Sequence, residues 1–130
     1  MRALIVEDEF LGRKVLKGFL TPLFESDSVV NGREAVEAVE LSLKEGRPYD
    51  LILMDIMMPE LDGVEALERI RALERERRAA PAKVIMVTAL DEPKTVIKSF
   101  HDGEASAYIV KPVDRDKLFA ELVKLGVIGK

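Results

Sequence analysis

Acidic residues directly follow two short apolar runs of the sequence. Glu7 and Asp8 come after the run at residues 4–6, and Asp55 comes after the run at residues 51–54. Carboxylates that are crowded together repel one another unless a cation lies among them. Carboxylate oxygens are hard ligands that suit Mg²⁺, so these acids predict a magnesium site if the fold brings them together.

A hydroxyl and an ammonium group follow two later apolar runs in the same way. Thr88 comes after the run at residues 84–87, and Lys111, itself followed by Pro112, comes after the run at residues 108–110. A lysine can hold a phosphoryl oxygen, and a threonine hydroxyl can donate a hydrogen bond to the same group. Together with the acids, these residues predict a carboxylate that accepts a phosphoryl group.

Each of these residues also has a purely structural explanation. Taken singly, Asp8 and Asp55 are as well explained as loop or helix-capping acids, and Thr88 is better explained as a cap. Glu7 alone could be a solvated acid at a helix start, and a lone Lys111 would usually lie with its stem over the edge of a sheet. Only their joint occurrence after apolar runs favours a functional site.

The apolar runs are expected to be the strands that position these side chains. Each run is rich in β-branched or other apolar residues and is too short to form anything but a strand of a sheet. The five expected strands are residues 4–6, 28–30, 51–54, 84–87 and 108–110.

Apolar residues recur at helical spacing between the expected strands. The spacing predicts one-faced amphipathic helices within residues 16–23, 36–43, 64–73 and 118–125, and a fifth helix from about residue 91 to 103. Five strands alternating with five helices predict an α/β fold, a parallel sheet covered on both faces in three α/β/α layers. Functional sites in such sheets lie beyond the carboxyl ends of the strands, so the polar residues that follow the apolar runs are expected to share one site at that edge.

Length, composition and net charge exclude or disfavour several kinds of site and of binding partner. A length of 130 residues predicts a single domain over residues 1–130, with no effector domain. The chain has no Cys and one His, His101, which exclude disulfides, thiolate zinc sites and multi-histidine metal sites. A net charge of -4 disfavours nonspecific binding of nucleic acid or acidic membranes, and the acids after residue 6 interrupt any signal-peptide core. A cytoplasmic protein is expected.

The motifs resemble the receiver domain of two-component response regulators across essentially all 130 residues. The resemblance is carried, in the family's order, by LIVEDE at residues 4–9, LILMDIMMP at 51–59 followed by Asp62-Gly63, VTA at 87–89 and YIVKP at 108–112. It implies a flavodoxin-like doubly wound sheet with the strand order 2-1-3-4-5.

The resemblance also implies a role for each candidate residue. Asp55 resembles the phosphoacceptor. Asp8 resembles a direct Mg²⁺ ligand, Glu7 an acid that holds the metal through water, and the Met57 carbonyl a further ligand. Thr88 resembles the hydroxyl that closes on the phosphoryl group, and Tyr108 resembles the ring that changes rotamer with it. Lys111 resembles the lysine that contacts a phosphoryl oxygen, and Pro112 resembles the proline that follows a cis peptide bond. Tyr108 is nearly as well explained as a half-buried strand aromatic.

The implied reaction is transfer of a phosphoryl group from a partner's phosphohistidine to Asp55. The implied partner is a sensor histidine kinase or a histidine phosphotransfer protein, followed by an unknown downstream protein. The implied protein is a phosphoacceptor, not a turnover enzyme. Phe10, Leu11, Lys14 and Val15 begin the first helix beside the acids, and part of this face is expected to contact the partner. Alternatively, Leu11 and Val15 belong to the core.

The sequence disfavours three other functions. Aspartyl-phosphate phosphatases and phosphotransferases carry an Asp-x-Asp motif. This motif is absent at Asp55, which is followed by Ile56 and Met57. A flavin or nucleotide binder would need a Gly-rich phosphate loop after the first strand, where Glu7, Asp8 and an adjoining acid would repel a phosphate. A docking module without phosphoryl chemistry would not need the full set of acids, threonine and lysine.

Overall fold

The structure, a computed structural model, describes residues 1–56, 61–88 and 105–129. One sheet of five parallel strands has the order β2-β1-β3-β4-β5. The strands are β1 (Arg2–Val6), β2 (Glu25–Val29), β3 (Leu51–Asp55), β4 (Lys83–Thr88) and β5 (Ala107–Val110). The predicted parallel sheet and its strand order are confirmed.

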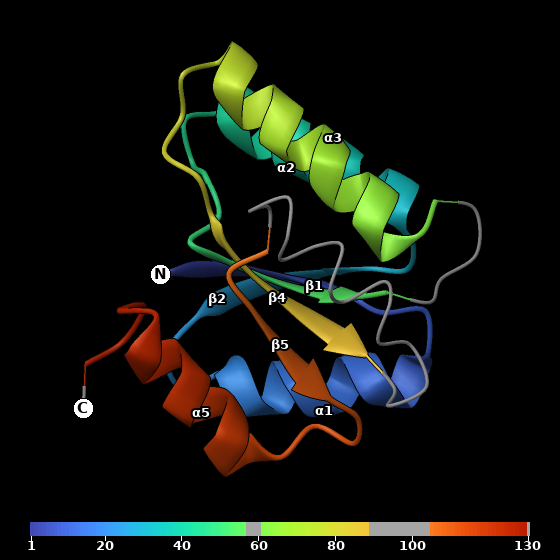
Figure 1. Cartoon of the computed structure of the whole chain (residues 1–130), viewed down its shortest axis with the longest axis vertical. Coiled ribbons are helices and arrows are strands. Elements are labelled where there is room, and N and C mark those ends of the chain that lie inside the picture. The colour runs from blue at the N-terminus through green and yellow to red at the C-terminus, as the bar shows by residue number, and fades with distance from the viewer. Residues whose placement is uncertain (57–60, 89–104, 130) are drawn as a thin grey trace.

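Helices cover both faces of the sheet. The described helices are α1 (Phe10–Leu20), α2 (Gly32–Lys44), α3 (Gly63–Glu76) and α5 (Arg115–Lys124). Figure 1 shows α2 and α3 on one face and α1 and α5 on the other, which gives the predicted three layers. The helix expected from about residue 91 to 103 lies outside the described residues.

Alternation along the buried strands divides the core into two parts. Leu4 and Ile52 belong to the cluster under α2 and α3, whereas Ile5 and Leu53 belong to the cluster under α1 and α5. Successive side chains of a strand point to opposite faces, so a strand that is covered on both faces must be apolar throughout. β3 is accordingly buried over its whole length.

The second strand differs from the sequence prediction. The predicted run at residues 28–30 covers only its end, because β2 begins at Glu25 and pairs with β1 from Arg2↔Glu25 to Val6↔Val29. β2 lies at the edge of the sheet and most of its residues are exposed or half-buried, so its sequence, ESDSV, needs no continuous apolar run. A search for apolar runs therefore finds only the end of an edge strand.

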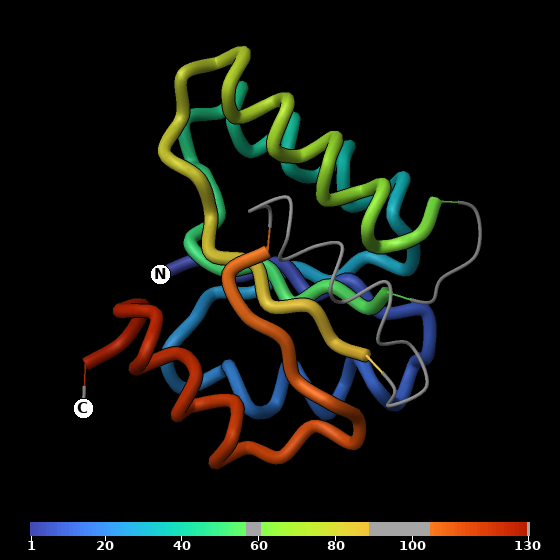
Figure 2. Tube along the Cα trace, in the orientation of Figure 1, coloured from blue at the N-terminus to red at the C-terminus, as the bar shows by residue number. Residues whose placement is uncertain are grey.

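The connections bring the carboxyl ends of the strands to one edge. The trace in Figure 2 passes from β1 to β4 by way of a helix after each strand, which is the connection that parallel strands require. The arrowheads of β3, β4 and β5 in Figure 1 point to the same edge of the sheet. Side chains that follow the strands therefore meet there.

Polar side chains fix the starts of two helices near this edge. The Asn31 side chain accepts a hydrogen bond from the Glu34 backbone N–H at 2.8 Å, and Asp62 accepts one from Glu65 N–H at 2.9 Å. These N-caps satisfy backbone donors that the first helical turn leaves without partners. α1 has no such cap, since the Glu9 side chain makes no capping hydrogen bond.

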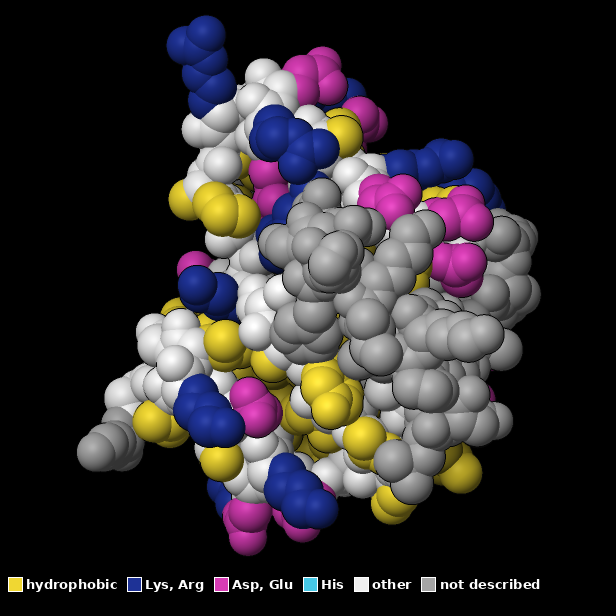
Figure 3. Space-filling model, viewed as in Figure 1, with side chains coloured by type: hydrophobic (Ala, Val, Ile, Leu, Met, Phe, Trp, Pro, Cys, Tyr) yellow, Lys and Arg dark blue, Asp and Glu magenta, His cyan; other side chains and the backbone are white. Residues whose placement is uncertain are grey.

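The outer surface carries charges of both signs. On the face shown in Figure 3, Lys and Arg side chains are interspersed with Asp and Glu. Among the described residues, no helix is both long and apolar enough to cross a membrane.

Candidate functional site

Three carboxylates meet at the carboxyl edge of the sheet. Asp55 ends β3 and Glu7 follows β1, and their exposed fractions are only 3% and 4%. Glu7, Asp8 and Asp55 each offer an oxygen atom within 4.8 Å of the other two. The predicted convergence of these acids is confirmed.

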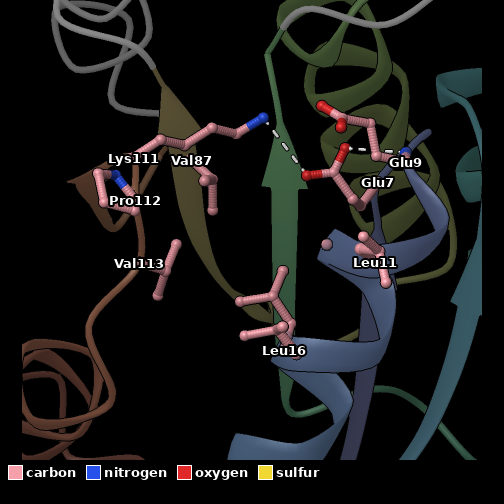
Figure 4. Close-up of a pocket in the computed structure, with 10 residues that line it drawn as sticks. Glu7, Glu9, Leu11, Leu16, Val87, Lys111, Pro112 and Val113 are labelled. Carbon is pink, nitrogen blue, oxygen red and sulfur yellow. Dashed lines mark hydrogen bonds and ion pairs between the residues drawn. The ribbon is translucent and has the colours of Figure 1, made fainter.

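Lys111 joins two of the carboxylates. Its Nζ lies 3.0 Å from Asp55 Oδ2 and 3.3 Å from Glu7 Oε1. Figure 4 shows the side chain reaching from the end of β5 toward Glu7. Burial opposes its charged form, but the hydrogen bond and charge of Asp55, followed by those of Glu7, outweigh burial and raise the pKa of the Lys111 ammonium above its ordinary value. Lys111 therefore stays protonated at neutral pH.

Asp8 lies at the exposed side of the cluster. Its slight burial, followed by the hydrogen bond and negative charge of Glu7, raises the pKa of the Asp8 carboxyl above its ordinary value. The charge of Lys111 opposes this shift but does not reverse it. The cluster thus holds more negative charge than Lys111 offsets, and its hard oxygen donors fit a divalent cation such as Mg²⁺.

The start of α1 holds Glu7 from two directions. The Glu9 backbone N–H donates to Glu7 Oε2 at 3.2 Å, and Arg13 Nη1 donates to the Glu7 backbone carbonyl at 2.9 Å. These contacts fix both the side chain and the backbone of Glu7. Arg13 could not be recognised as a site residue from the sequence, because nothing there distinguishes this arginine from the other cations of α1.

The remaining predicted residues lie on the two strands beside Asp55. Thr88 ends β4 with 3% of its surface exposed, and its backbone carbonyl accepts a hydrogen bond from Lys111 N–H at 2.8 Å. Tyr108 of β5 is 47% exposed, so its ring lies at the surface. The Lys111–Pro112 peptide bond is cis, as the resemblance implies. Met57 lies outside the described residues.

An apolar groove adjoins the acidic cluster. It has a volume of about 440 Å³ and runs between α1 and the segment that follows β5. Its apolar walls are formed by Leu11, Val15, Leu16, Val87, Pro112 and Val113, several of which Figure 4 labels. Leu11 is 71% exposed and Val15 is 48% exposed, so the alternative that these two residues belong to the core is wrong.

A family model decides the assignment. The model described as "Response regulator receiver domain" matches residues 3–123 of the chain. The chain belongs to this family. As a receiver domain of two-component signalling, it shares the phosphoacceptor role that is standard for the family.

Relatives agree with the assignment. The chemotaxis protein CheY of Bacillus subtilis is 37% identical over 125 residues, which cover 95% of each chain. The transcriptional regulatory protein TcrA of Mycobacterium tuberculosis is 38% identical over 130 residues, which cover 99% of this chain and 47% of that protein. The receiver thus spans nearly the whole of a CheY but less than half of TcrA.

A solved structure supports the fold of the receiver domain. The receiver domain of the sensor histidine kinase PA1611 of Pseudomonas aeruginosa is 31% identical, with a TM-score of 0.77 over 96% of this chain and 97% of that one. That structure has a magnesium ion coordinated in the active site cleft.

Proposed function

We propose that Asp55 accepts a phosphoryl group from a phosphohistidine on a partner protein. The observation that carries this proposal is the contact between Lys111 Nζ and Asp55 Oδ2, at 3.0 Å, inside a cluster of three carboxylates. A buried carboxylate paired with a lysine, beside further acids that can hold a divalent cation, suits a nucleophile whose product carries additional negative charge.

The reaction is an in-line displacement at phosphorus. A carboxylate oxygen of Asp55 forms the new bond to phosphorus, the bond from phosphorus to the partner's imidazole nitrogen breaks, and its electron pair stays on that nitrogen. The transition state spreads negative charge over three phosphoryl oxygens. Lys111, already at hydrogen-bond distance from Asp55, and the buried Thr88 hydroxyl are the groups that offset this charge.

In this proposal Asp8 and Asp55 would hold Mg²⁺ directly, Glu7 would act through water, and the Met57 carbonyl would be the further ligand that the family resemblance implies. When bound, Mg²⁺ offsets the charge of the carboxylates and of the phosphoryl oxygens. The proposal is supported by the hard oxygen donors that meet within 4.8 Å. An indirect role for Glu7 is supported by the protein partners of both its oxygens, Lys111 Nζ for Oε1 and the Glu9 backbone N–H for Oε2.

The phosphoryl group changes the surface through Thr88 and Tyr108. Thr88 is buried at the end of β4, whereas Tyr108 lies at the surface on the neighbouring strand β5. Movement of the Thr88 hydroxyl toward the phosphoryl group would shift the end of β4 and make room for the Tyr108 ring. The downstream protein then recognises the altered surface.

The partner docks on α1. The exposed side chains of Phe10, Leu11 and Val15 lie on a helix that also carries three cations and no acid. The groove that Leu11 and Val15 line also reaches Lys111. We therefore assign this face to a histidine-bearing helix whose apolar side chains enter the groove and whose acids face the cations of α1. The partner is a sensor histidine kinase or a histidine phosphotransfer protein.

The receiver acts as a stoichiometric phosphoacceptor in the cytoplasm, not as a turnover enzyme. The absence of Asp-x-Asp at Asp55 and the family assignment both favour this function over an aspartyl-phosphate phosphatase. The family assignment likewise favours it over a flavin or nucleotide binder.

The phosphohistidine source is tested with a radiolabelled histidine phosphotransfer protein as donor. We expect the label to move to the receiver in Mg²⁺, and to be released by hydroxylamine, which cleaves acyl phosphates. A chelator should prevent the transfer. Label that resists hydroxylamine would place the phosphoryl group on another kind of side chain and contradict the proposal.

A further inference from the structure

Gly12 lies against the side chain of Glu7. A Cβ atom added at Gly12 would be 3.0 Å from both Cγ and Oε1 of Glu7, and 3.1 Å from Cδ. Carbon atoms in favourable contact are about 3.5–4.0 Å apart, so a Cβ atom at Gly12 would require the Glu7 side chain to shift by a few tenths of an ångström. A glycine at this position leaves the Glu7 side chain in its place without that shift.

The Glu7 carboxylate makes two contacts from this space. Oε1 pairs with Lys111 Nζ at 3.3 Å, and Oε2 accepts the Glu9 backbone N–H at 3.2 Å. Oε1 is also one of the two Glu7 atoms that an added Cβ would approach most closely. A methyl group at Gly12 would therefore press against the oxygen that pairs with Lys111.

We infer that Gly12 is a positioning residue for the acidic cluster. By leaving room for Glu7 against α1, it keeps that carboxylate on Lys111, beside the Asp8 and Asp55 carboxylates of the proposed metal site. Groups that orient metal ligands from outside the coordination sphere commonly change metal affinity by about 10–100-fold when they are mutated. This inference rests on the proposed function, because it takes the acidic cluster to be a Mg²⁺ site.

Gly18 provides a matched control within the same helix. It also lies in α1, and an added Cβ there would meet nothing within 4 Å. Gly12→Ala and Gly18→Ala therefore make the same chemical change in one helix, and differ in whether the new methyl group meets Glu7. Both remove the conformational freedom of a helical glycine, so helix propensity favours each variant alike.

The first measurement is Mg²⁺ affinity by calorimetry. We expect Gly12→Ala to weaken Mg²⁺ binding at least threefold and Gly18→Ala to leave it within the error of the parent. Glu7→Ala removes all the Glu7 atoms that the new methyl group would meet. In that background Gly12→Ala should have no effect on Mg²⁺ binding. Unchanged binding in Gly12→Ala, or an equal loss with and without Glu7, would overturn the inference.

The second measurement needs no metal. Gly18→Ala should raise the melting temperature by roughly 2–5 °C, as expected for a helical Gly→Ala change in a domain of this size. Gly12→Ala should fall short of that gain in the parent and reach it in the Glu7→Ala background. Equal gains in both backgrounds would overturn the contact between Gly12 and Glu7. A parent that binds no Mg²⁺ at millimolar concentration would instead overturn the proposed metal site, while the melting temperatures would still report on this contact.

Discussion

The Lys111 ammonium lies 3.0 Å from the Asp55 carboxylate, although 56 positions separate the two residues in the sequence. Their strands are not neighbours, because β4 lies between β3 and β5. The pair therefore depends on the parallel register of three strands, which brings the end of each to the same edge. Lys111 is fixed there by its backbone hydrogen bond to Thr88.

The first prediction concerns this pair. Lys111→Met should lower the rate of phosphorylation of Asp55 by about 10²-fold, the usual effect of removing one charge-stabilising donor from an active site. Phosphorylation by a small phosphodonor in excess Mg²⁺, followed by mass spectrometry, measures the rate. Lys117→Met is the control, since Lys117 is exposed on α5. A rate within twofold of the parent would show that Lys111 has no part in the reaction.

The second prediction separates the roles of two acids. Asp8→Asn should weaken Mg²⁺ binding by about tenfold or more, and Glu7→Gln should weaken it less, because Glu7 acts through water and both its oxygens already have protein partners. The chain has no Trp to report binding by fluorescence, so calorimetry or NMR titration is the measurement. Equal losses in the two variants would mean that both acids bind the metal in the same way.

The third prediction concerns docking on α1. Leu11→Glu should lower the kcat/KM of phosphotransfer from a histidine-bearing partner by at least about tenfold, the cost typical of a buried interface residue. Phosphorylation by a small phosphodonor should not change, because that donor needs no docking surface. Leu41→Glu on α2 is the matched control, since Leu41 is also exposed. If both variants accept phosphate from the partner as the parent does, docking lies elsewhere.

The fourth prediction concerns stability at the opposite edge of the sheet. The Tyr49 hydroxyl donates to Asp27 Oδ2 at 2.6 Å, and the Arg2 guanidinium lies 4.5 Å from the centre of the Tyr49 ring. Tyr49→Phe should lower the free energy of unfolding at pH 7 by about 1 kcal/mol, the usual contribution of one hydrogen bond.

The effect of Tyr49→Phe should depend on pH. Burial, and then the hydrogen bond and charge of Asp27, raise the pKa of the Tyr49 phenol above its ordinary value of 10.0. A group with a raised folded pKa contributes stability that is complete below its unfolded pKa and is lost as the pH rises toward the folded one. Urea unfolding should therefore show a smaller difference between parent and variant at pH 11 than at pH 7. A difference that grew with pH would contradict the assigned shift.

The sequence predicted the site better than its surroundings. Residues after buried parallel strands must converge, so the acids and Lys111 could be placed from the apolar runs alone. The extent of β2 could not be predicted from apolar runs, because an edge strand exposes most of its residues. Helical spacing also could not show that Leu11 and Val15 are exposed, since a periodic pattern does not reveal where the buried stripe of a helix ends.

Contacts within the site were harder to predict. The pairing of Lys111 with Glu7, as well as with Asp55, depends on where the Glu7 side chain lies on α1. That position is set by the space at Gly12 and by the backbone donor of Glu9, and Arg13 fixes the Glu7 carbonyl. These are contacts of individual atoms, which residue types and spacing do not specify.

The central claim is that Asp55 is the phosphoacceptor, and intact-protein mass spectrometry with peptide mapping tests it most directly. The parent, incubated with a small phosphodonor and Mg²⁺, should gain one phosphoryl group that maps to Asp55. Asp55→Asn should keep the fold and gain none, because the amide has nearly the same shape but is a poor nucleophile. A phosphoryl group on another residue of the parent, or undiminished phosphorylation of Asp55→Asn, would contradict the account.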